Sequence, residues 1–217
     1  MKSNHTPDNA VAAANNNDLI RTHFDRAAAQ WDFRQNEILL QRNLIALLEH
    51  AGVGAGETIL DAGCGTGLST GALLSMLSPG GRVFALDLSP HMLRAAIAKY
   101  PDPRCVYLEG EIQNLPMAKD SVDRCLAYSS WPHFEHPARI GEELQRVLKV
   151  GGRVHIWHHD SRERVNRIHH HIGGVIAAHI FPSSRELIDS MQTFAFKLVE
   201  LVDTAAELRI TFEKHAL

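Results

Sequence analysis

The sequence predicts an α/β fold in which a doubly wound and mostly parallel sheet carries helices on both faces. Short apolar runs alternate along the chain with segments of helical periodicity, which is typical of βαβ units with right-handed crossovers. A glycine-rich turn, with Gly63, Gly65 and Gly67 at every second position, joins the first of these runs to a helix-forming segment. With 217 residues, the chain has the length of one such domain.

Seven strands are expected, five in alternation with helices and two after a helical insertion. The strands are expected near 58–61, 82–86, 105–108, 122–127, 153–157, 195–202 and 207–212, with helices near 68–78, 90–99 and 137–148. Further helices are expected at 19–31, 37–51, about 160–180 and 185–192. We expect a disordered tail at 1–17 and one domain at 18–217, with a helical cap at 18–51 and a helical insertion at 158–193.

Composition excludes several function classes. The formal net charge is -3, and the absence of a basic run argues against a nucleic-acid partner. No apolar run reaches membrane-spanning length, so we expect no membrane partner. Cys64, Cys105 and Cys125 show no Cys-x-x-Cys spacing, and the N-terminus lacks the blocks of a secretory signal. These features predict a cytoplasmic location.

The glycine turn and the next strand together indicate a nucleoside-containing ligand. Glycines let the backbone turn sharply and approach a ligand closely. Asp61, at the end of the first strand, can accept hydrogen bonds or face a cation. Asp87 ends the second strand twenty residues after Gly67, where an acidic residue is placed to bind a ribose diol.

Four motifs in order resemble those of the class I S-adenosylmethionine-dependent methyltransferases. The motifs are Asp-Ala-Gly-Cys-Gly-Thr-Gly at 61–67, Ala-Leu-Asp-Leu-Ser-Pro-His-Met-Leu at 85–93, Glu-Gly-Glu-Ile-Gln-Asn-Leu-Pro-Met at 109–117 and Leu-Lys-Val-Gly-Gly-Arg-Val at 148–154. The resemblance covers about residues 24–157. It implies a Rossmann-like seven-stranded sheet with an antiparallel last strand, S-adenosylmethionine as cofactor and S-adenosylhomocysteine as product.

The resemblance also implies roles for individual residues. Asp87 is expected to hold the ribose hydroxyls, Glu111 the adenine amino group, and the Ile112 amide the adenine ring edge. Gly63 and Gly65 are expected to approach the methionine portion, which Asp61 would fix directly or through water. The full set of expected cofactor-binding residues is Asp61, Ala62, Gly63, Gly65, Asp87, Leu88, Met92, Glu111, Ile112 and Ala127.

The acceptor is expected to be a small molecule bound by the insertion at 158–193 and by residues after the fourth strand. His133 stands where the resembling family often carries a His facing the methyl group, as a base or an acceptor-orienting group, with a buried structural His as the alternative. Trp31 and His158 are further candidates for substrate binding. The chain has no Asn-Pro-Pro-Tyr or Asp-Pro-Pro-Tyr run, which disfavours DNA adenine and protein glutamine as substrates. The acceptor atom stays open between oxygen, nitrogen, carbon and sulfur, and the oligomeric state is open.

The chain has 14 histidines, of which seven fall between His155 and His179. His169, His170 and His171 point around a helix, and position 173 is Gly, so no helical pair four residues apart forms there. A metal site would need partners from different segments, and we expect none.

Two alternatives to a methyltransferase stay open. The first is a non-catalytic S-adenosylmethionine-binding partner or sensor protein, and the second is a histidine-rich protein that handles a metal or metallocofactor. Nicotinamide-dependent hydride transfer is disfavoured, because the glycines run Gly-x-Gly-x-Gly and the later motifs follow the methyltransferase pattern.

Overall fold

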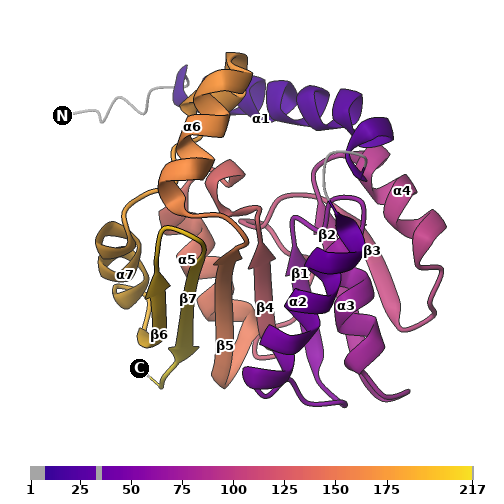
Figure 1. Ribbon diagram of the computed structural model, residues 1–217. Helices are drawn as coiled ribbons and strands as arrows, with labels where there is room; N and C mark the ends of the chain where they lie inside the picture. Colours follow the sequence, from indigo (N-terminus) through magenta and orange to yellow (C-terminus); the bar gives the residue numbers. More distant parts are fainter. Residues whose placement is uncertain (1–7, 33–35, 217) are drawn as a thin grey trace.

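The computed structural model describes residues 8–32 and 36–216. A seven-stranded sheet with the order β3-β2-β1-β4-β5-β7-β6 forms its centre (Figure 1). The strands are β1 Thr58–Ala62, β2 Arg82–Asp87, β3 Cys105–Glu109, β4 Val122–Tyr128, β5 Leu148–His158, β6 Phe196–Asp203 and β7 Leu208–Lys214. Only β7 pairs antiparallel with its neighbours, β5 and β6. The predicted fold, with an antiparallel last strand, is confirmed.

The described helices follow the predicted order. They are α1 Asp8–Ala27, α2 Glu37–His50, α3 Leu68–Met76, α4 Pro90–Lys99, α5 Pro137–Val147, α6 Arg162–Ile172 and α7 Ser184–Gln192, with short 3-10 segments η1 Ala28–Gln30, η3 Trp131–His133 and η4 Gly174–Ala178. No described helix is long and apolar enough to span a lipid bilayer.

Two hydrophobic clusters cover the two faces of the sheet. One packs α5 and α7 against β4, β5 and β7, and the other packs α2, α3 and α4 against β1, β2, β4 and β5. Successive side chains of β4 point to opposite faces of the sheet, because Cys125 and Ala127 belong to the first cluster and Leu126 belongs to the second. A central strand buried on both faces is the arrangement that the near-continuous apolar runs predict.

The first helix begins earlier than predicted. α1 starts at Asp8, so residues 8–17 are helical and do not belong to a disordered tail, while residues 1–7 of that predicted tail lie outside the described residues. The run Ala-Val-Ala-Ala-Ala at 10–14 explains the difference, since alanine has the highest helix propensity. Figure 1 shows α1 lying across the carboxyl ends of the strands, from α6 to α4.

The first helix of the insertion is shorter than predicted, and the chain turns back after it. α6 ends at Ile172 and not near residue 180, because Gly173 and Gly174 adopt positive φ angles of 74° and 59°. The chain then returns through η4, which contacts both α6 and α1. This return brings the end of the histidine-rich segment back over the sheet.

Candidate functional site

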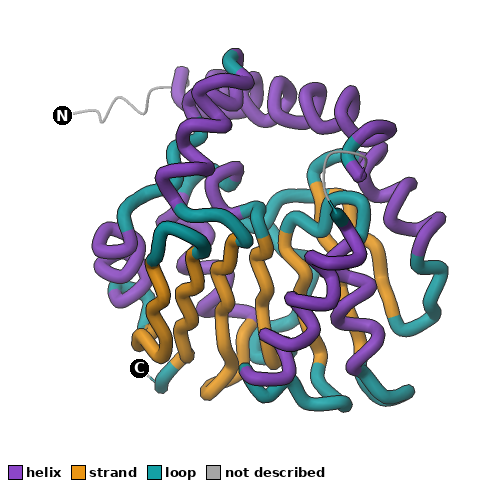
Figure 2. The backbone as a smooth tube through the Cα atoms, viewed as in Figure 1, coloured by secondary structure: helices purple, strands orange, loops and turns teal. Residues whose placement is uncertain are grey.

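A cavity of about 640 Å³ lies at the carboxyl edge of the sheet, the edge at which such folds bind ligands. Its walls come from the glycine turn, the loops after β2, β3, β4 and β5, and the helices α1 and α6. Figure 2 shows these two helices above the strand ends, with the loops between them. The cavity therefore joins the motif loops to the helical insertion.

The glycine turn supplies one wall of the cavity. Gly63 has φ of 73°, and a Cβ there would lie 2.5 Å from the Cβ of Ser130, so this glycine permits close packing. Gly65 has φ of 55°, lines the cavity, and a Cβ there would meet no atom within 4 Å. The two glycines therefore differ in role: Gly63 fits the turn against the loop after β4, and Gly65 leaves open space beside the cavity.

Asp87 lies beside this turn, at the end of β2. Its Oδ2 accepts the Gly65 N–H at 2.8 Å and its Oδ1 accepts the Ser89 N–H at 2.8 Å. Burial raises the pKa of Asp87 to about 6, although these backbone hydrogen bonds favour the carboxylate. Each carboxylate oxygen keeps a further lone pair, so the group can accept two hydroxyl donors from the cavity.

Asp61, predicted to fix the methionine portion directly or through water, lies behind the cavity wall. It does not line the cavity, and its fully buried carboxylate accepts hydrogen bonds from Ser69 Oγ at 2.8 and 2.9 Å and from Thr70 Oγ1 at 2.6 Å. Burial raises its pKa to about 6. Asp61 therefore fixes the first turn of α3. Ala62 and Ala127 are likewise buried away from the cavity lining.

The other predicted cofactor residues line the cavity, namely Gly63, Gly65, Asp87, Leu88, Met92, Glu111 and Ile112. Both oxygens of Glu111 are held by amides, because Asn17 Nδ2 donates to Oε1 at 2.7 Å and Gln113 Nε2 donates to Oε2. Sequence reasoning missed Asn17, which lies in the predicted tail. Nothing in its local sequence pointed to a partner 94 residues away.

The cavity is also lined by a histidine cluster around His133. The Nδ1 of His133 lies 2.9 Å from Nδ1 of His179, and its ring centroid lies 4.8 Å from that of His169. The His169 Nδ1 donates to the His179 carbonyl at 2.5 Å. Burial and the neighbouring histidines hold the pKa of His133 well below its ordinary value, so the imidazole is neutral.

Two polar atoms at this cluster have no partner among the described residues: His179 Nε2 and Glu135 Oε2, both buried. The other oxygen of Glu135 accepts Asn16 Nδ2 from α1. Burial lowers the pKa of His179 below its ordinary value, and the charge of Glu135 opposes this shift. Of this cluster, the sequence predicted His133 and did not predict His179 or Glu135. An uninterrupted helix to about residue 180 would not have returned His179 to the loop after β4.

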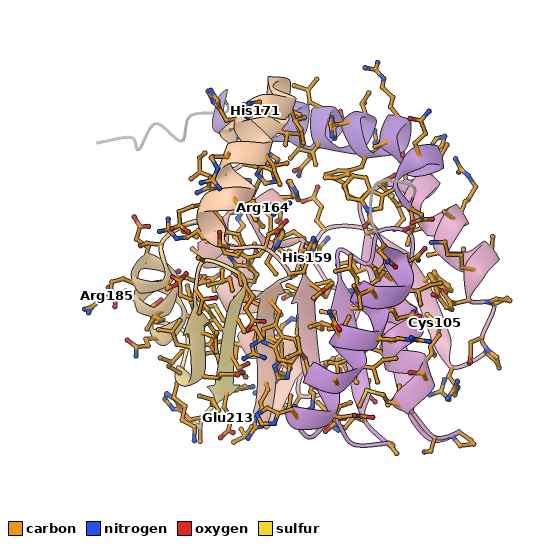
Figure 3. The ribbon with its side chains drawn as sticks, viewed as in Figure 1. Cys105, His159, Arg164, His171, Arg185 and Glu213 are labelled. Atoms are coloured by element: carbon orange, nitrogen blue, oxygen red, sulfur yellow. The ribbon has the colours of Figure 1, made fainter. Side chains whose placement is uncertain are left out.

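Trp31 and His158, both predicted to bind substrate, also line the cavity. Trp31 packs edge-on against Phe24, whose ring packs in turn against His133 at a centroid distance of 5.0 Å. His158 ends β5, and burial lowers its pKa to about 3. Figure 3 shows that the next residue, His159, lies at the sheet edge below Arg164 of α6, whereas His171 lies toward the far end of α6.

Comparison with known proteins agrees with this architecture. The profile of the family described as “Methyltransferase domain” matches residues 60–156, from β1 through β5. This segment is a class I methyltransferase domain. The methyl donor of that class is S-adenosylmethionine, and the open space at Gly65 beside Asp87 fits such a ligand. The resemblance drawn from the four motifs is confirmed.

Curated relatives match this domain and its surroundings. The 2-methyl-6-phytyl-1,4-hydroquinone methyltransferase of Spinacia oleracea is 38% identical over 96 residues, which are 44% of this chain and 28% of the relative. The malonyl-[acyl-carrier protein] O-methyltransferase of Herminiimonas arsenicoxydans is 37% identical over 141 residues, which are 60% of this chain and 47% of the relative. The chain thus spans less than half the length of these two relatives.

A solved structure shows the same fold. A chain from the complex that contains the Haloferax volcanii Trm112 methyltransferase activator superposes with a TM-score of 0.71. The match covers 89% of this chain and 98% of that chain, at 22% identity.

Proposed function

We propose that this protein transfers a methyl group from S-adenosylmethionine to a small-molecule acceptor inside the cavity. The observation that carries the proposal is that two chemically different groups of residues line one cavity. Asp87, Glu111 and Gly65 form the first group, which we call the cofactor end, and the neutral His133 with its neighbouring His169 forms the second, which we call the acceptor end. The relatives named as 2-methyl-6-phytyl-1,4-hydroquinone methyltransferase and malonyl-[acyl-carrier protein] O-methyltransferase support an acceptor other than nucleic acid.

In this proposal the first end holds the cofactor. The Asp87 carboxylate accepts the ribose hydroxyls, and the backbone at Gly63 and Gly65 lies against the methionine portion. Glu111 and the Ile112 amide bind the adenine. To donate to Glu111, the adenine amino group must replace one of its two present donors, the side-chain amide of Asn17 or that of Gln113. Asp61, Ala62 and Ala127 support this end from behind the cavity wall.

The second end aligns the acceptor and takes up its proton. Methyl transfer is an in-line displacement, in which orientation alone can contribute about 7–11 kcal/mol. A hydroxyl or thiol acceptor also needs a base, and a neutral imidazole is a suitable one. If His133 Nδ1–H donates to His179 Nδ1, then His133 Nε2 keeps its lone pair and His179 Nε2 carries a proton. Glu135 Oε2 also lacks a partner and does not hydrogen-bond His179 Nε2 in this structure, so in this proposal Glu135 acts on His179 through its charge.

Calorimetric titration with S-adenosylhomocysteine tests the cofactor end. Asp87→Ala leaves the ribose hydroxyls without their acceptor, and we expect a loss of about 1–3 kcal/mol, or roughly 5-fold to 150-fold in affinity. Asp189→Ala, a change at an exposed carboxylate on α7, is the matched control and should bind normally. Failure of the unsubstituted protein to bind S-adenosylhomocysteine would overturn the proposal.

Acceptor screening tests the second end. Release of S-adenosylhomocysteine is followed with phenolic, carboxylate and thiol compounds, first with the unsubstituted protein and then with His133→Ala. Binding of the cofactor without turnover of any acceptor class would favour the alternative of a non-catalytic binding protein.

A further inference from the structure

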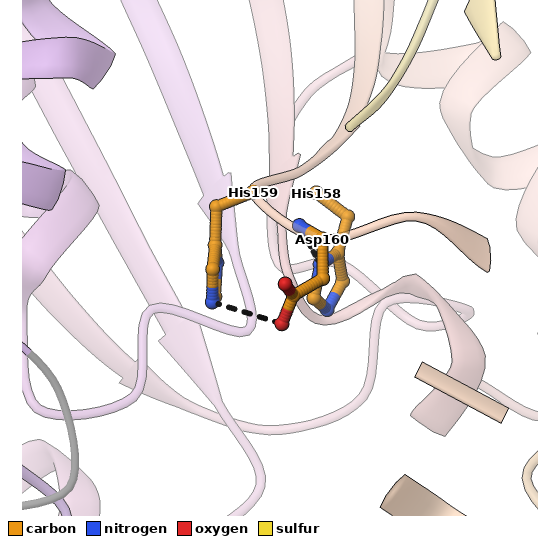
Figure 4. Close-up of side chains that lie close together, drawn as sticks. All are labelled: His158, His159 and Asp160. Atoms are coloured by element: carbon orange, nitrogen blue, oxygen red, sulfur yellow. Dashed lines mark hydrogen bonds and ion pairs between the residues drawn. The ribbon is translucent and has the colours of Figure 1, made fainter. Parts of the chain in front are cut away.

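Three donor groups converge at the carboxyl end of β5 and at the start of the loop that follows it. His158, His159 and Asp160, which we call the β5-loop triad, each offer one metal-ligand atom, and these three atoms lie within 4.8 Å of one another (Figure 4). Two imidazoles and a carboxylate are a donor set that suits divalent first-row transition metals. All three residues line the cavity.

Neighbouring groups hold two of the three donors in place. Ser129 Oγ lies 3.0 Å from His159 Nδ1, so the hydroxyl can accept that N–H and leave Nε2 with a free lone pair. Asp160 Oδ1 pairs with Arg164 Nε at 3.1 Å, and Asp160 Oδ2 lies 3.7 Å from His159 Nε2. Supporting groups that orient an imidazole and a carboxylate are typical of metal sites.

Of the three donors, His158 must change its hydrogen bonding most in order to bind a metal ion. Its Nδ1 accepts the Asp160 N–H at 3.0 Å, and its ring stacks on that of His159 with centroids 4.8 Å apart. A neutral ring in this state carries its proton on Nε2. Ligation through Nε2 requires the other neutral tautomer, in which the proton moves to Nδ1, and an Nδ1 that carries a proton can no longer accept the hydrogen bond from the Asp160 amide. His159 and Asp160 are therefore the anchoring ligands, and His158 completes the set.

The alternative is a hydrogen-bonded cluster that never binds a cation. In that case the His158 and His159 side chains would serve only to line the cavity and to hold the carboxylate of Asp160. The two arrangements differ in what they need from Asp160. A divalent transition metal such as Zn²⁺ is bound by the carboxylate oxygens of Asp and Glu, and a neutral amide oxygen is a weaker ligand for it, whereas that amide oxygen still accepts hydrogen bonds.

We propose that the β5-loop triad binds one divalent transition-metal ion at the acceptor end of the cavity. The proposal departs from the expectation drawn from the sequence, which required histidines from different segments. It does not depend on methyl transfer, since the ligands lie on one loop and bind the ion in the absence of cofactor. The remaining coordination positions of the ion face the space that an acceptor would occupy.

Titration of tag-free, chelator-treated protein with Zn²⁺, followed by calorimetry, and with Co²⁺, followed by visible absorption, tests the proposal. We expect one tight site with a stoichiometry of one ion per chain. Asp160→Asn and His159→Ala should each weaken this site at least tenfold, and Ser129→Ala should weaken it less. The double variant His170→Ala, His171→Ala removes two exposed histidines of α6 and should keep the site, because neither belongs to the triad.

The outcomes separate the two arrangements. Equal metal affinity of Asp160→Asn and unsubstituted protein would overturn the proposal, as would loss of the site in the α6 double variant, which would assign binding to surface histidines. Unfolding midpoints and S-adenosylhomocysteine affinity, both measured in chelator, show whether each variant retains its fold and cofactor cavity. A protein that binds S-adenosylhomocysteine but no Zn²⁺ contradicts this inference alone.

Discussion

The glycine turn offers a test in which the backbone conformation is matched and the surroundings differ. Gly63, Gly65 and Gly151 all have positive φ angles, of 73°, 55° and 81°. An alanine in this left-handed region costs about 1–2 kcal/mol. For a chain of 217 residues, each kcal/mol lowers Tm by about 2–4 °C. All three alanine variants should therefore show this common loss of stability.

The variants differ in what the new methyl group meets. At Gly63 it would lie 2.5 Å from Ser130 Cβ and 3.0 Å from Ser130 Oγ, so overpacking adds about 1–3 kcal/mol to the conformational cost. At Gly65 and Gly151 it meets no atom within 4 Å. Of these last two glycines, Gly65 lines the cavity and Gly151 does not. We expect Gly65→Ala to lower S-adenosylhomocysteine affinity at least tenfold and Gly151→Ala to leave it unchanged.

Urea unfolding gives the stability of each variant, and calorimetry gives the affinity. If Gly63→Ala is no more destabilised than Gly151→Ala, the close packing against Ser130 is not what requires a glycine there. If Gly65→Ala binds S-adenosylhomocysteine as tightly as the unsubstituted protein, the open space beside Gly65 is not where the cofactor lies. Gly151→Ala is the control that shows whether lower stability alone reduces the affinity for S-adenosylhomocysteine.

Two further predictions concern titrating groups. Burial raises the pKa of Asp61 in the folded protein from its ordinary value of 3.8 to about 6. Between these two values the folded state binds more protons than the unfolded state, so the contribution of Asp61 to stability is lost as the pH rises from about 4 to 6. The unfolding free energy of Asp61→Asn relative to the unsubstituted protein should therefore rise across this range, and a constant difference would contradict the raised pKa. For the acceptor end, His133→Ala should lower turnover by about 10²–10⁴-fold with unchanged cofactor affinity. His179→Ala should shift the pH profile of turnover, because His179 contacts His133. His170→Ala, at an exposed position, should change neither the turnover rate nor its pH profile. Normal turnover of His133→Ala would show that His133 has a structural role.

The parts of the site that the sequence predicts are those encoded locally. The glycine turn, Asp87 and the 109–117 loop each follow a strand end, so the parallel topology alone brings them to one edge. Asp61 also follows this rule in position, but its carboxylate turns toward Ser69 and Thr70 of the next helix. Strand position predicts which edge a residue occupies and does not predict which neighbour its side chain selects.

The parts that the sequence does not predict depend on tertiary contacts. The His133–His179 contact spans 46 residues and exists because Gly173 and Gly174 end α6 early. Counting histidines predicts neither this return of the chain nor the convergence of the β5-loop triad. The position of α1 over the cavity is equally non-local, since polar asparagines in an alanine-rich segment give no amphipathic pattern to align it.

The contacts of α1 connect the two ends of the cavity. Asn17 donates to Glu111 at the cofactor end, and the preceding residue, Asn16, donates to Glu135 at the histidine end. Farther along the same helix, Asp25 accepts the Ser89 hydroxyl at 2.6 Å beside the start of α4. Because one rigid element makes all three contacts, removing one changes the position of the others, and their free energies should not be additive. If the proposed function holds, we expect cofactor affinity and acceptor geometry to be coupled through α1, although the residues of the two ends belong to different loops.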